Sequence, residues 1–253
     1  MAAERELWVV QLGRLPYAEG LALQERVRDA RERDLLPDTL LLLEHDPVYT
    51  RGRRTAPGEL PLPALWYAER GIEIVGVDRG GRATYHGPGQ LVGYPIVRTA
   101  DVLDHVRGME RMIAAALAEE GVTAAGRTDD GPDYTGVWVG GERKIASLGV
   151  HVRRGITTHG FAVNVDNDLQ PFEWIVPCGL DGVTMTSVAR ETGRGGSLLP
   201  CVRRRVAYAY ASDRGLRQRL VTPAALDRVL SAPAPAPVRV APSSARISVL
   251  GRS

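Results

Sequence analysis

The apolar residues of the first half of the chain alternate between strand-like and helix-like patterns. Four short apolar runs have the length and composition of buried strands: residues 7–12, 39–44, 72–78 and 91–97. Residues 16–33 show helical spacing after Pro16, and residues 101–121 show it between Asp101, a suitable N-cap, and Gly121, a suitable C-cap. The second helix would bury one face: Leu103, Val106, Met109, Ile113 and Leu117. This order predicts an α/β protein.

The second half of the chain favours antiparallel sheet. Three strands with short connections are predicted: residues 134–139, 143–152 and 156–165. Gly140 and Gly141 form the first connection, and we expect a three-residue loop at residues 153–155 for the second. Such a loop pairs Val152 with Ile156. Helical stretches are expected near residues 186–191 and 202–212, with an irregular segment before them.

The second hairpin brings small residues together. The expected register places Ser147 opposite Phe161, Leu148 opposite Gly160 and Gly149 opposite His159, with Ala162 next along the strand. Small residues on facing strands leave room for an apolar ligand. Along the first strand Lys144, Ala146 and Leu148 share one face, so we expect the lysine to point away from water.

A glycine-rich segment separates two of the predicted strands. It reads Arg79-Gly80-Gly81-Arg82-Ala83-Thr84-Tyr85-His86-Gly87-Pro88-Gly89-Gln90. We expect no regular structure here, but a loop that presents backbone N–H groups and lets a ligand approach the main chain. A purely structural Ω-loop is the alternative. The segment lacks the Gly-Lys-Ser/Thr of a phosphate-binding loop.

Length and composition indicate one globular domain. The chain has 253 residues and 44% hydrophobic residues, and no apolar run reaches the ~18 residues of a membrane span. With only Cys178 and Cys201 there is no disulfide framework, so we expect the cytoplasm. The first residues show no secretion signal. We expect a catalytic domain over residues 1–230 and a flexible Ala/Pro/Arg-rich tail over 231–253.

The formal net charge of +2 hides an asymmetry along the chain. Residues 203–253 hold 10 Arg against Asp213 and Asp227, which is +8, and the remainder is −6. A basic end can attract an acidic protein or a nucleic acid. Few aromatic residues are interleaved and no zinc or helix-turn-helix signature is present, so a solvated surface is favoured and no nucleic-acid partner is expected.

Lys144 is the single lysine among 32 cationic residues, and all the others are arginine. Guanidinium stays protonated in proteins, whereas a buried ammonium can lose its proton and act as a base. Lys144 is therefore a candidate chemical group. Chance survival at an exposed strand position is the alternative.

Cys178 is the candidate nucleophile, because Pro177 and Gly179 display it on an irregular loop. A nearby ammonium favours the thiolate, so Cys178 and Lys144 form a nucleophile and base pair. A pair with His86 or His159 is the alternative. Zinc is not expected, because the histidines and cysteines lack close ligand spacing.

Taken together, these segments resemble the octanoyltransferases of lipoate biosynthesis, also called lipoate-protein ligase B. The matching stretches follow one another in family order: residues 41–45 with 47–50, 79–90, 136–138, 144–149, 159–164 and 177–179. Ala83 stands where the family has a valine, and the Ala/Pro-rich end lies outside the resemblance. Six linked motifs are far more specific than a lone glycine pattern.

The resemblance implies the biotin/lipoyl protein ligase-like fold, a single α/β domain with a mixed, mostly antiparallel sheet flanked by helices. It also implies that Cys178 takes octanoate from octanoyl-acyl carrier protein as a thioester. The acyl group then passes to a lysine of apo lipoyl domains, those of 2-oxoacid dehydrogenase complexes and glycine cleavage H protein. Lys144 matches the lysine that activates the cysteine. No cofactor or metal is implied.

The resemblance also assigns an acyl-binding set. The matching residues are Arg79, Gly80, Gly81, Arg82, Ala83, Thr84, Tyr85, His86, Ser147, Leu148, Gly149, His159, Gly160, Phe161 and Ala162. Competing functions are an ATP-dependent lipoate or biotin ligase of the same fold, a cysteine hydrolase, and an inert binding protein. A need for Cys178 separates the transferase from the ligase and from the binding protein. Dependence on a histidine, with water as acceptor, would indicate the hydrolase.

Overall fold

A computed structural model of the chain describes residues 5–176 and 183–232. In this range nine strands form the main sheet, ordered β12-β1-β2-β6-β10-β9-β8-β7, with β11 beside β9. Their bounds are β1 Glu6–Leu15, β2 Asp38–His45, β6 Gln90–Ile96, β7 Ala124–Gly126, β8 Gly136–Val139, β9 Arg143–Arg153, β10 Ile156–Asn164, β11 Thr184–Met185 and β12 Arg217–Val221. Strand β1 is parallel to β12 and β2, β11 is parallel to β9, and the other pairs are antiparallel. The predicted mixed, mostly antiparallel sheet is confirmed.

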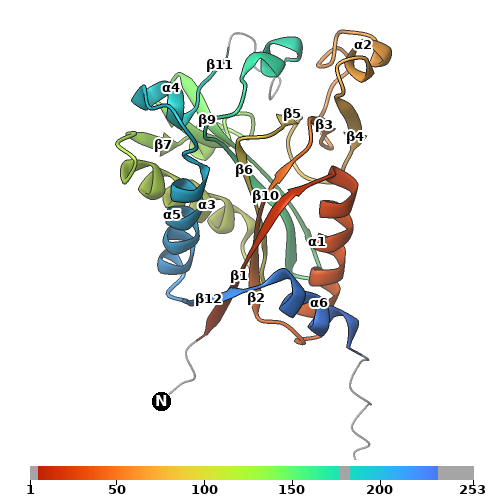
Figure 1. Cartoon of the computed structure of the whole chain (residues 1–253), viewed down its shortest axis with the longest axis vertical. Helices are drawn as coiled ribbons and strands as arrows, with labels where there is room; N and C mark the ends of the chain where they lie inside the picture. The colour runs from red at the N-terminus through yellow and green to blue at the C-terminus, as the bar shows by residue number, and fades with distance from the viewer. Residues whose placement is uncertain (1–4, 177–182, 233–253) are drawn as a thin grey trace, which may run out of the picture.

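Helices cover both faces of this sheet (Figure 1). The bounds are α1 Tyr17–Glu32 and α6 Pro223–Ser231 on one face, and α3 Val102–Ala118 and α5 Leu199–Asp213 on the other. The run of four leucines in β2 serves both layers, because Leu40 and Leu42 join the core under α3 and α5 while Leu41 and Leu43 join the core under α1. Short helix α4 spans Val188–Thr192. The predicted flanking helices are confirmed.

A second, three-stranded sheet stands at one end of the main sheet (Figure 1). Its strands are β3 Val48–Arg51, β4 Glu73–Gly76 and β5 Ala83–His86, with helix α2 at Ala64–Ala68 and a 3-10 helix at Gln170–Trp174 nearby. Strand β5 corrects the expectation that residues 79–90 form no regular structure. All four of its residues are buried, and β5 pairs with β3 in antiparallel register.

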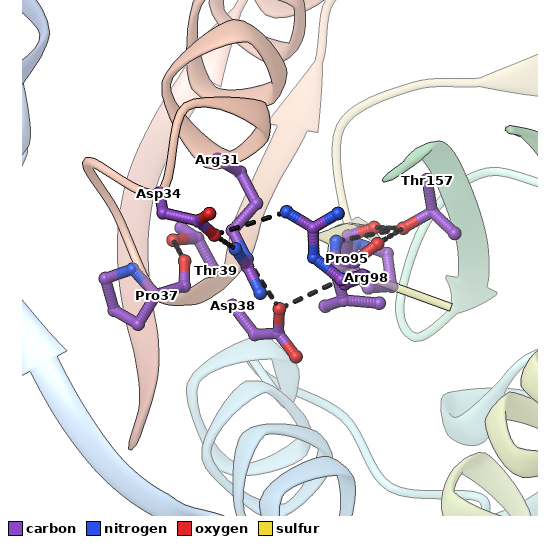
Figure 2. Close-up of polar contacts among 9 residues, drawn as sticks. Arg31, Asp34, Pro37, Asp38, Thr39, Pro95, Arg98 and Thr157 are labelled. Carbon is purple, nitrogen blue, oxygen red and sulfur yellow. Dashed lines mark hydrogen bonds and ion pairs between the residues drawn. The ribbon is translucent and has the colours of Figure 1, made fainter. Parts of the chain in front are cut away.

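The opposite end of the main sheet is held by ion pairs and hydrogen bonds (Figure 2). Asp38 Oδ1 accepts from Arg31 Nε at 2.9 Å and from the backbone N–H of Arg98 at 3.1 Å. Thr157 Oγ1 donates to Pro95 O at 2.6 Å. These contacts tie α1, β2, β6 and β10 together at this end.

The sequence expectations for the helices hold in part. The Asp101 carboxylate accepts from the N–H groups of Leu103 and Asp104 at 2.8 and 3.0 Å and caps α3. Leu103 itself is 46% exposed, which corrects its place on the buried face. Strand β12 and helix α6 were not foreseen. The tail from residue 233 lies outside the described residues, so the boundary at residue 230 stays a prediction.

The hairpin of β9 and β10 differs from the expected register by one residue. Arg153 pairs with Ile156, so the turn consists of Arg154 and Gly155 alone. Both have positive φ, 51° and 76°, which a two-residue type I′ turn requires. Nothing in the spacing showed that an arginine would adopt this conformation. The true pairs are Gly149 with Gly160, Leu148 with Phe161 and Ser147 with Ala162.

Candidate active site

A partly open pocket lies beside α1 and β5 on the main sheet. Most residues of the predicted acyl-binding set line it: Arg79, Gly81, Arg82, Thr84, His86, Ser147, Leu148, Gly149, His159, Gly160, Phe161 and Ala162. Lys144 lines it as well. The structure therefore brings segments far apart in the sequence to one place.

Three members of the predicted set do not line this pocket. Ala83 and Tyr85 alternate with Thr84 and His86 along β5, so their side chains point to the opposite face. Tyr85 packs there against Tyr49 of β3 and Phe172 of the 3-10 helix. Gly80 uses its N–H to bind Val150 O at 2.9 Å, which fastens the glycine-rich segment to β9.

Small residues on β9 and β10 form the floor of the pocket. Gly149 lies opposite Gly160, and Ser147 lies opposite Ala162. A Cβ at Gly160 would meet Gly93 O at 2.3 Å, and one at Gly149 would meet Gly80 O at 2.7 Å. The neighbouring backbone therefore approaches both glycines too closely for a larger residue at either position.

A β-bulge at Ile145 directs Lys144 into the pocket. Strand β8 pairs with Lys144 and with Ala146 through consecutive residues, so Ile145 has no partner in β8. As a result Lys144 and Ser147 line the pocket, whereas Ala146 joins the core under α3 and α5. The bulge corrects the prediction that Lys144, Ala146 and Leu148 share one face, because alternation breaks at the extra residue.

Lys144 is 1% exposed and is held by the start of β8. Its Nζ donates to Thr135 O at 2.9 Å and lies 5.0 Å from the centre of the Trp138 ring. Gly136 has φ +148°, and a Cβ there would lie 2.5 Å from Lys144 Cε. The expectation that the lysine points away from water is confirmed, and its aliphatic stem fits only because residue 136 is glycine.

His86 presents an unprotonated nitrogen to its surroundings. Gln90 Nε2 donates to Tyr85 O at 3.1 Å and to Asn164 Oδ1 at 2.9 Å, so Gln90 Oε1 is the acceptor for His86 Nδ1 at 2.8 Å. Burial, with smaller contributions from His45 and Arg79, lowers the pKa of His86 to about 3. His86 is therefore a neutral ring with its proton on Nδ1.

Two tyrosines that the sequence patterns did not single out also line the pocket. Tyr17 opens α1 and stacks on His86 with ring centres 6.1 Å apart. Tyr94, inside β6, lies 2.7 Å from His45 Nε2, while His45 Nδ1 donates to Leu15 O at 2.9 Å. Burial raises the pKa of Tyr17 to about 12. Tyr17 lies in a predicted helix and Tyr94 in a predicted apolar strand, so the pattern alone gave no functional signal.

His159 occupies a strained position in the pocket wall. Its φ is +58°, and its N–H donates to Gln24 Oε1 of α1 at 2.7 Å. Its Nε2 lies 2.8 Å from Asp78 Oδ1. Burial lowers the pKa of His159 in spite of this carboxylate. The Asp78 contact fixes the ring orientation and places the proton of the neutral ring on Nε2.

Charged residues surround the mouth of the pocket. Asp133 binds Arg54 at 3.0 Å and Arg82 at 3.1 Å, and Arg82 also binds Glu59 at 2.8 Å. Burial raises the pKa of Asp133, but Arg82 and Arg54 outweigh it and lower the pKa overall. The other Glu59 oxygen accepts from the N–H of Ala83. Three loops are thus joined at the rim.

Only one of the two cysteines lies in the described part of the chain. Cys178 lies outside the described residues, so its pairing with Lys144 stays a prediction. Cys201 is exposed in the first turn of α5 and does not line the pocket.

Metal binding and membrane insertion find no support in the described part of the chain. No group of three His, Cys, Asp or Glu residues there could hold a metal ion. None of its helices has the length and hydropathy to cross a membrane. That the protein needs neither cofactor nor metal remains an expectation.

Comparison with known proteins decides the family. The model of the lipoyl protein ligase A/B catalytic domain matches residues 16–205. The chain belongs to this family. Within the family, an octanoyltransferase of Acidothermus cellulolyticus is 47% identical over 189 residues, covering 72% of this chain and 80% of that protein. An octanoyltransferase of Myxococcus xanthus is 45% identical over 195 residues, covering 74% of this chain and 54% of that protein.

A solved structure has the same fold. The bipartite lipoate protein ligase of Thermoplasma acidophilum, studied with its E2 lipoyl domain, has a TM-score of 0.69 at 17% identity, covering 89% of this chain and 90% of that one. The predicted resemblance to octanoyltransferases and the predicted fold are both confirmed.

Proposed function

We propose that this octanoyltransferase moves an octanoyl group from octanoyl-acyl carrier protein to a lysine of an apo lipoyl domain through a thioester on Cys178. One observation carries most weight: a buried lysine, Lys144, lies beside a pocket whose floor is built from Gly, Ser and Ala. Burying a methylene stabilises binding by ~0.8 kcal/mol, so an eight-carbon chain in this space supplies much of the binding energy.

The first half-reaction transfers the acyl group to the enzyme. The Cys178 thiolate attacks the thioester carbonyl, a new C–S bond forms, and the bond to the phosphopantetheine sulfur breaks. That sulfur leaves as a thiolate and takes up a proton. Lys144 in its ammonium form favours the cysteine thiolate and is a proton donor for the leaving sulfur.

The second half-reaction forms the amide. The acceptor lysine attacks the acyl-enzyme carbonyl, the C–N bond forms, and Cys178 leaves as the thiolate. Lys144, neutral after the first step, accepts the proton that the attacking amine loses. Exchange of a thioester for an amide is downhill, so no ATP is required.

The acceptor proteins follow from the family. Relatives carry the name octanoyltransferase, and a fold relative was studied with its E2 lipoyl domain. We infer that lipoyl domains of 2-oxoacid dehydrogenase complexes and the glycine cleavage H protein are the acceptors here, with acyl carrier protein as donor. The cytoplasm, where these proteins reside, is the expected compartment.

A transfer assay tests the proposal. Purified enzyme is mixed with octanoyl-acyl carrier protein and an apo lipoyl domain without ATP, and the domain is weighed by mass spectrometry. We expect one octanoyl group on the domain. Octanoylation only from free octanoate with ATP would identify a ligase, and release of free octanoate without modification of the domain would identify a hydrolase.

A further inference from the structure

One peptide group lies between two buried side chains of opposite charge. The carbonyl oxygen of Thr135 accepts from Lys144 Nζ at 2.9 Å. The N–H of Gly136, which belongs to the same peptide group, donates to Glu110 Oε1 at 2.8 Å. The described residues contain no cis peptide, so this C=O and N–H point in opposite directions. Glu110 and Lys144 therefore bind the two ends of one dipole.

Glu110 is built into this position. It lies in α3, is 5% exposed, and its Oε1 also accepts from Thr128 Oγ1 at 2.6 Å. A Cβ at Gly126 would lie 2.5 Å from Glu110 Oε2, so the carboxylate crosses β7 only because residue 126 is glycine. A buried carboxylate that accepts two hydrogen bonds is held in one orientation.

We propose that Glu110 is a positioning residue for Lys144, acting through the Thr135–Gly136 peptide. This inference rests on the proposed function, in which Lys144 serves the acyl transfer. Glu110 polarises the peptide, so the Thr135 oxygen carries more negative charge and holds the ammonium more strongly. Without Glu110 the buried N–H of Gly136 loses its acceptor, which costs free energy and loosens the start of β8.

The single lysine makes the test specific. Full-length protein labelled with ¹³C,¹⁵N-lysine has one side chain that contributes Lys signals, so the ε-carbon and ε-ammonium resonances of Lys144 need no further assignment. The spectrum reports the hydrogen bond and the mobility of this group directly. It does not depend on substrate or on Cys178.

Three variants are compared with wild type. Glu110→Gln keeps an acceptor oxygen but loses the charge, and we expect a shifted yet ordered Lys144 signal and near-normal acyl transfer. Glu110→Ala removes the acceptor, and we expect loss of the protected ammonium signal and acyl transfer about tenfold slower, the size of one charge-assisted hydrogen bond. Glu120→Gln is the matched control, because Glu120 is also buried beside α3 but pairs with Arg194 and Arg205.

Lys144 signals in Glu110→Gln that superimpose on wild type would overturn the proposal, and this variant keeps the test valid if Glu110→Ala fails to fold. Equal shifts in the Glu120→Gln control would overturn it too. Failure of the proposed function is distinguishable, because then Lys144→Arg would still transfer octanoate while the Glu110 variants moved the Lys144 signal.

Discussion

Lys144 is surrounded by groups that differ in chemistry: a carbonyl, an indole ring and a glycine. Thr135 O accepts its proton, Trp138 offers the face of its ring, and Gly136 leaves room for the stem. An ammonium in such a place keeps its hydrogen bonds while losing most of its water. The arrangement suits a group that exchanges a proton with a bound substrate.

Lys144→Arg is predicted to fold and to lose acyl transfer. Arginine retains the positive charge but does not deprotonate in proteins, so the rate should fall on the order of 10²-fold or more, as for loss of a general base. The rate of thioester formation with octanoyl-acyl carrier protein measures this, with circular dichroism to check the fold. Near-normal turnover would remove Lys144 from the mechanism.

Gly136→Ala is predicted to destabilise the protein and to displace Lys144. A Cβ at this position would lie 2.5 Å from both Ala146 O and Lys144 Cε, and φ is +148°, so unfolding should need about 1–3 kcal/mol less free energy. Urea denaturation and the transfer rate measure the two effects.

Gly141→Ala is the matched control for this change. Gly141 also has positive φ, but a Cβ there would meet nothing within 4 Å. It should lower stability through backbone strain while leaving the transfer rate unchanged. A similar loss of rate in both variants would refute the argument from contact with Lys144.

A functional residue of a rare type could be recognised from the sequence, whereas functional residues of a common type could not. Lys144 stood out because it is unique, and its burial agrees with that prediction. Tyr17 and Tyr94 line the pocket but did not stand out, because aromatic residues in a helix or an apolar strand usually belong to the hydrophobic core. Only the three-dimensional structure distinguishes a tyrosine that lines the pocket from a tyrosine that packs in the core.

At the scale of elements, the turn of the β9–β10 hairpin sets the register of the pocket floor. A two-residue turn at Arg154 and Gly155 places Gly149 opposite Gly160, whereas a three-residue turn would have shifted every pair. Type I′ turns favour Asn-Gly, so Arg-Gly gave a weak signal. The bulge at Ile145 was equally invisible, since it depends on pairing with β8.

Arg154→Asn is predicted to stabilise the hairpin. Asparagine adopts φ near +51° with less strain than arginine, so unfolding should need about 0.5 kcal/mol more free energy. The exposed ion pair of Arg154 with Glu32 is lost, but such pairs contribute little. Urea denaturation tests this, with Arg153→Asn in the strand as control. A less stable Arg154→Asn variant would contradict the turn assignment.

At the scale of the whole molecule, the charge asymmetry along the chain is partly balanced in space. Arginines of the basic end pair with acidic residues of the rest: Arg203 with Glu44, Arg205 with Glu120, and Arg217 and Arg219 with Glu6. Part of the positive charge of the basic end is therefore balanced within the protein. Sequence counts of charge carry no information on such pairing.

Buried histidines are predicted to make the protein sensitive to mild acid. Burial lowers the pKa of His45, His86, His105 and His159, to about 3 for His86 and His105, below the ordinary 6.5 that applies after unfolding. The unfolded chain therefore binds more protons between pH 6.5 and 3. The contribution of these histidines to stability is therefore complete above pH 6.5 and falls as the pH falls through this window.

The His105→Gln variant tests the predicted loss of stability with falling pH. His105 belongs to α3, contacts Arg214 and does not line the pocket, so the variant should leave transfer intact. Between pH 6 and 5 the free energy of unfolding should depend less steeply on pH in the variant than in wild type. The two slopes should differ by up to about 1.4 kcal/mol per pH unit, the value for one proton. Denaturation at several pH values measures the slope. An unchanged slope would contradict the burial argument.

The longer helices and strands, the sheet type and the gathering of distant motifs could be predicted from the sequence, because they follow from apolar periodicity and from linked motifs. The register, the bulge and the strand inside residues 79–90 could not, since they depend on which strands meet in space. Pocket residues such as Ser147 to Gly149 were predicted correctly, although the predicted register of the β9–β10 hairpin was wrong by one residue.

The acyl-enzyme is the central claim, and intact-protein mass spectrometry tests it most directly. Wild-type enzyme and Cys178→Ser are each mixed with octanoyl-acyl carrier protein and weighed. We predict that wild type gains one octanoyl group that hydroxylamine removes and that the variant gains none, as a thioester on Cys178 requires. No adduct on wild type, or an equal adduct on Cys178→Ser, would contradict the account.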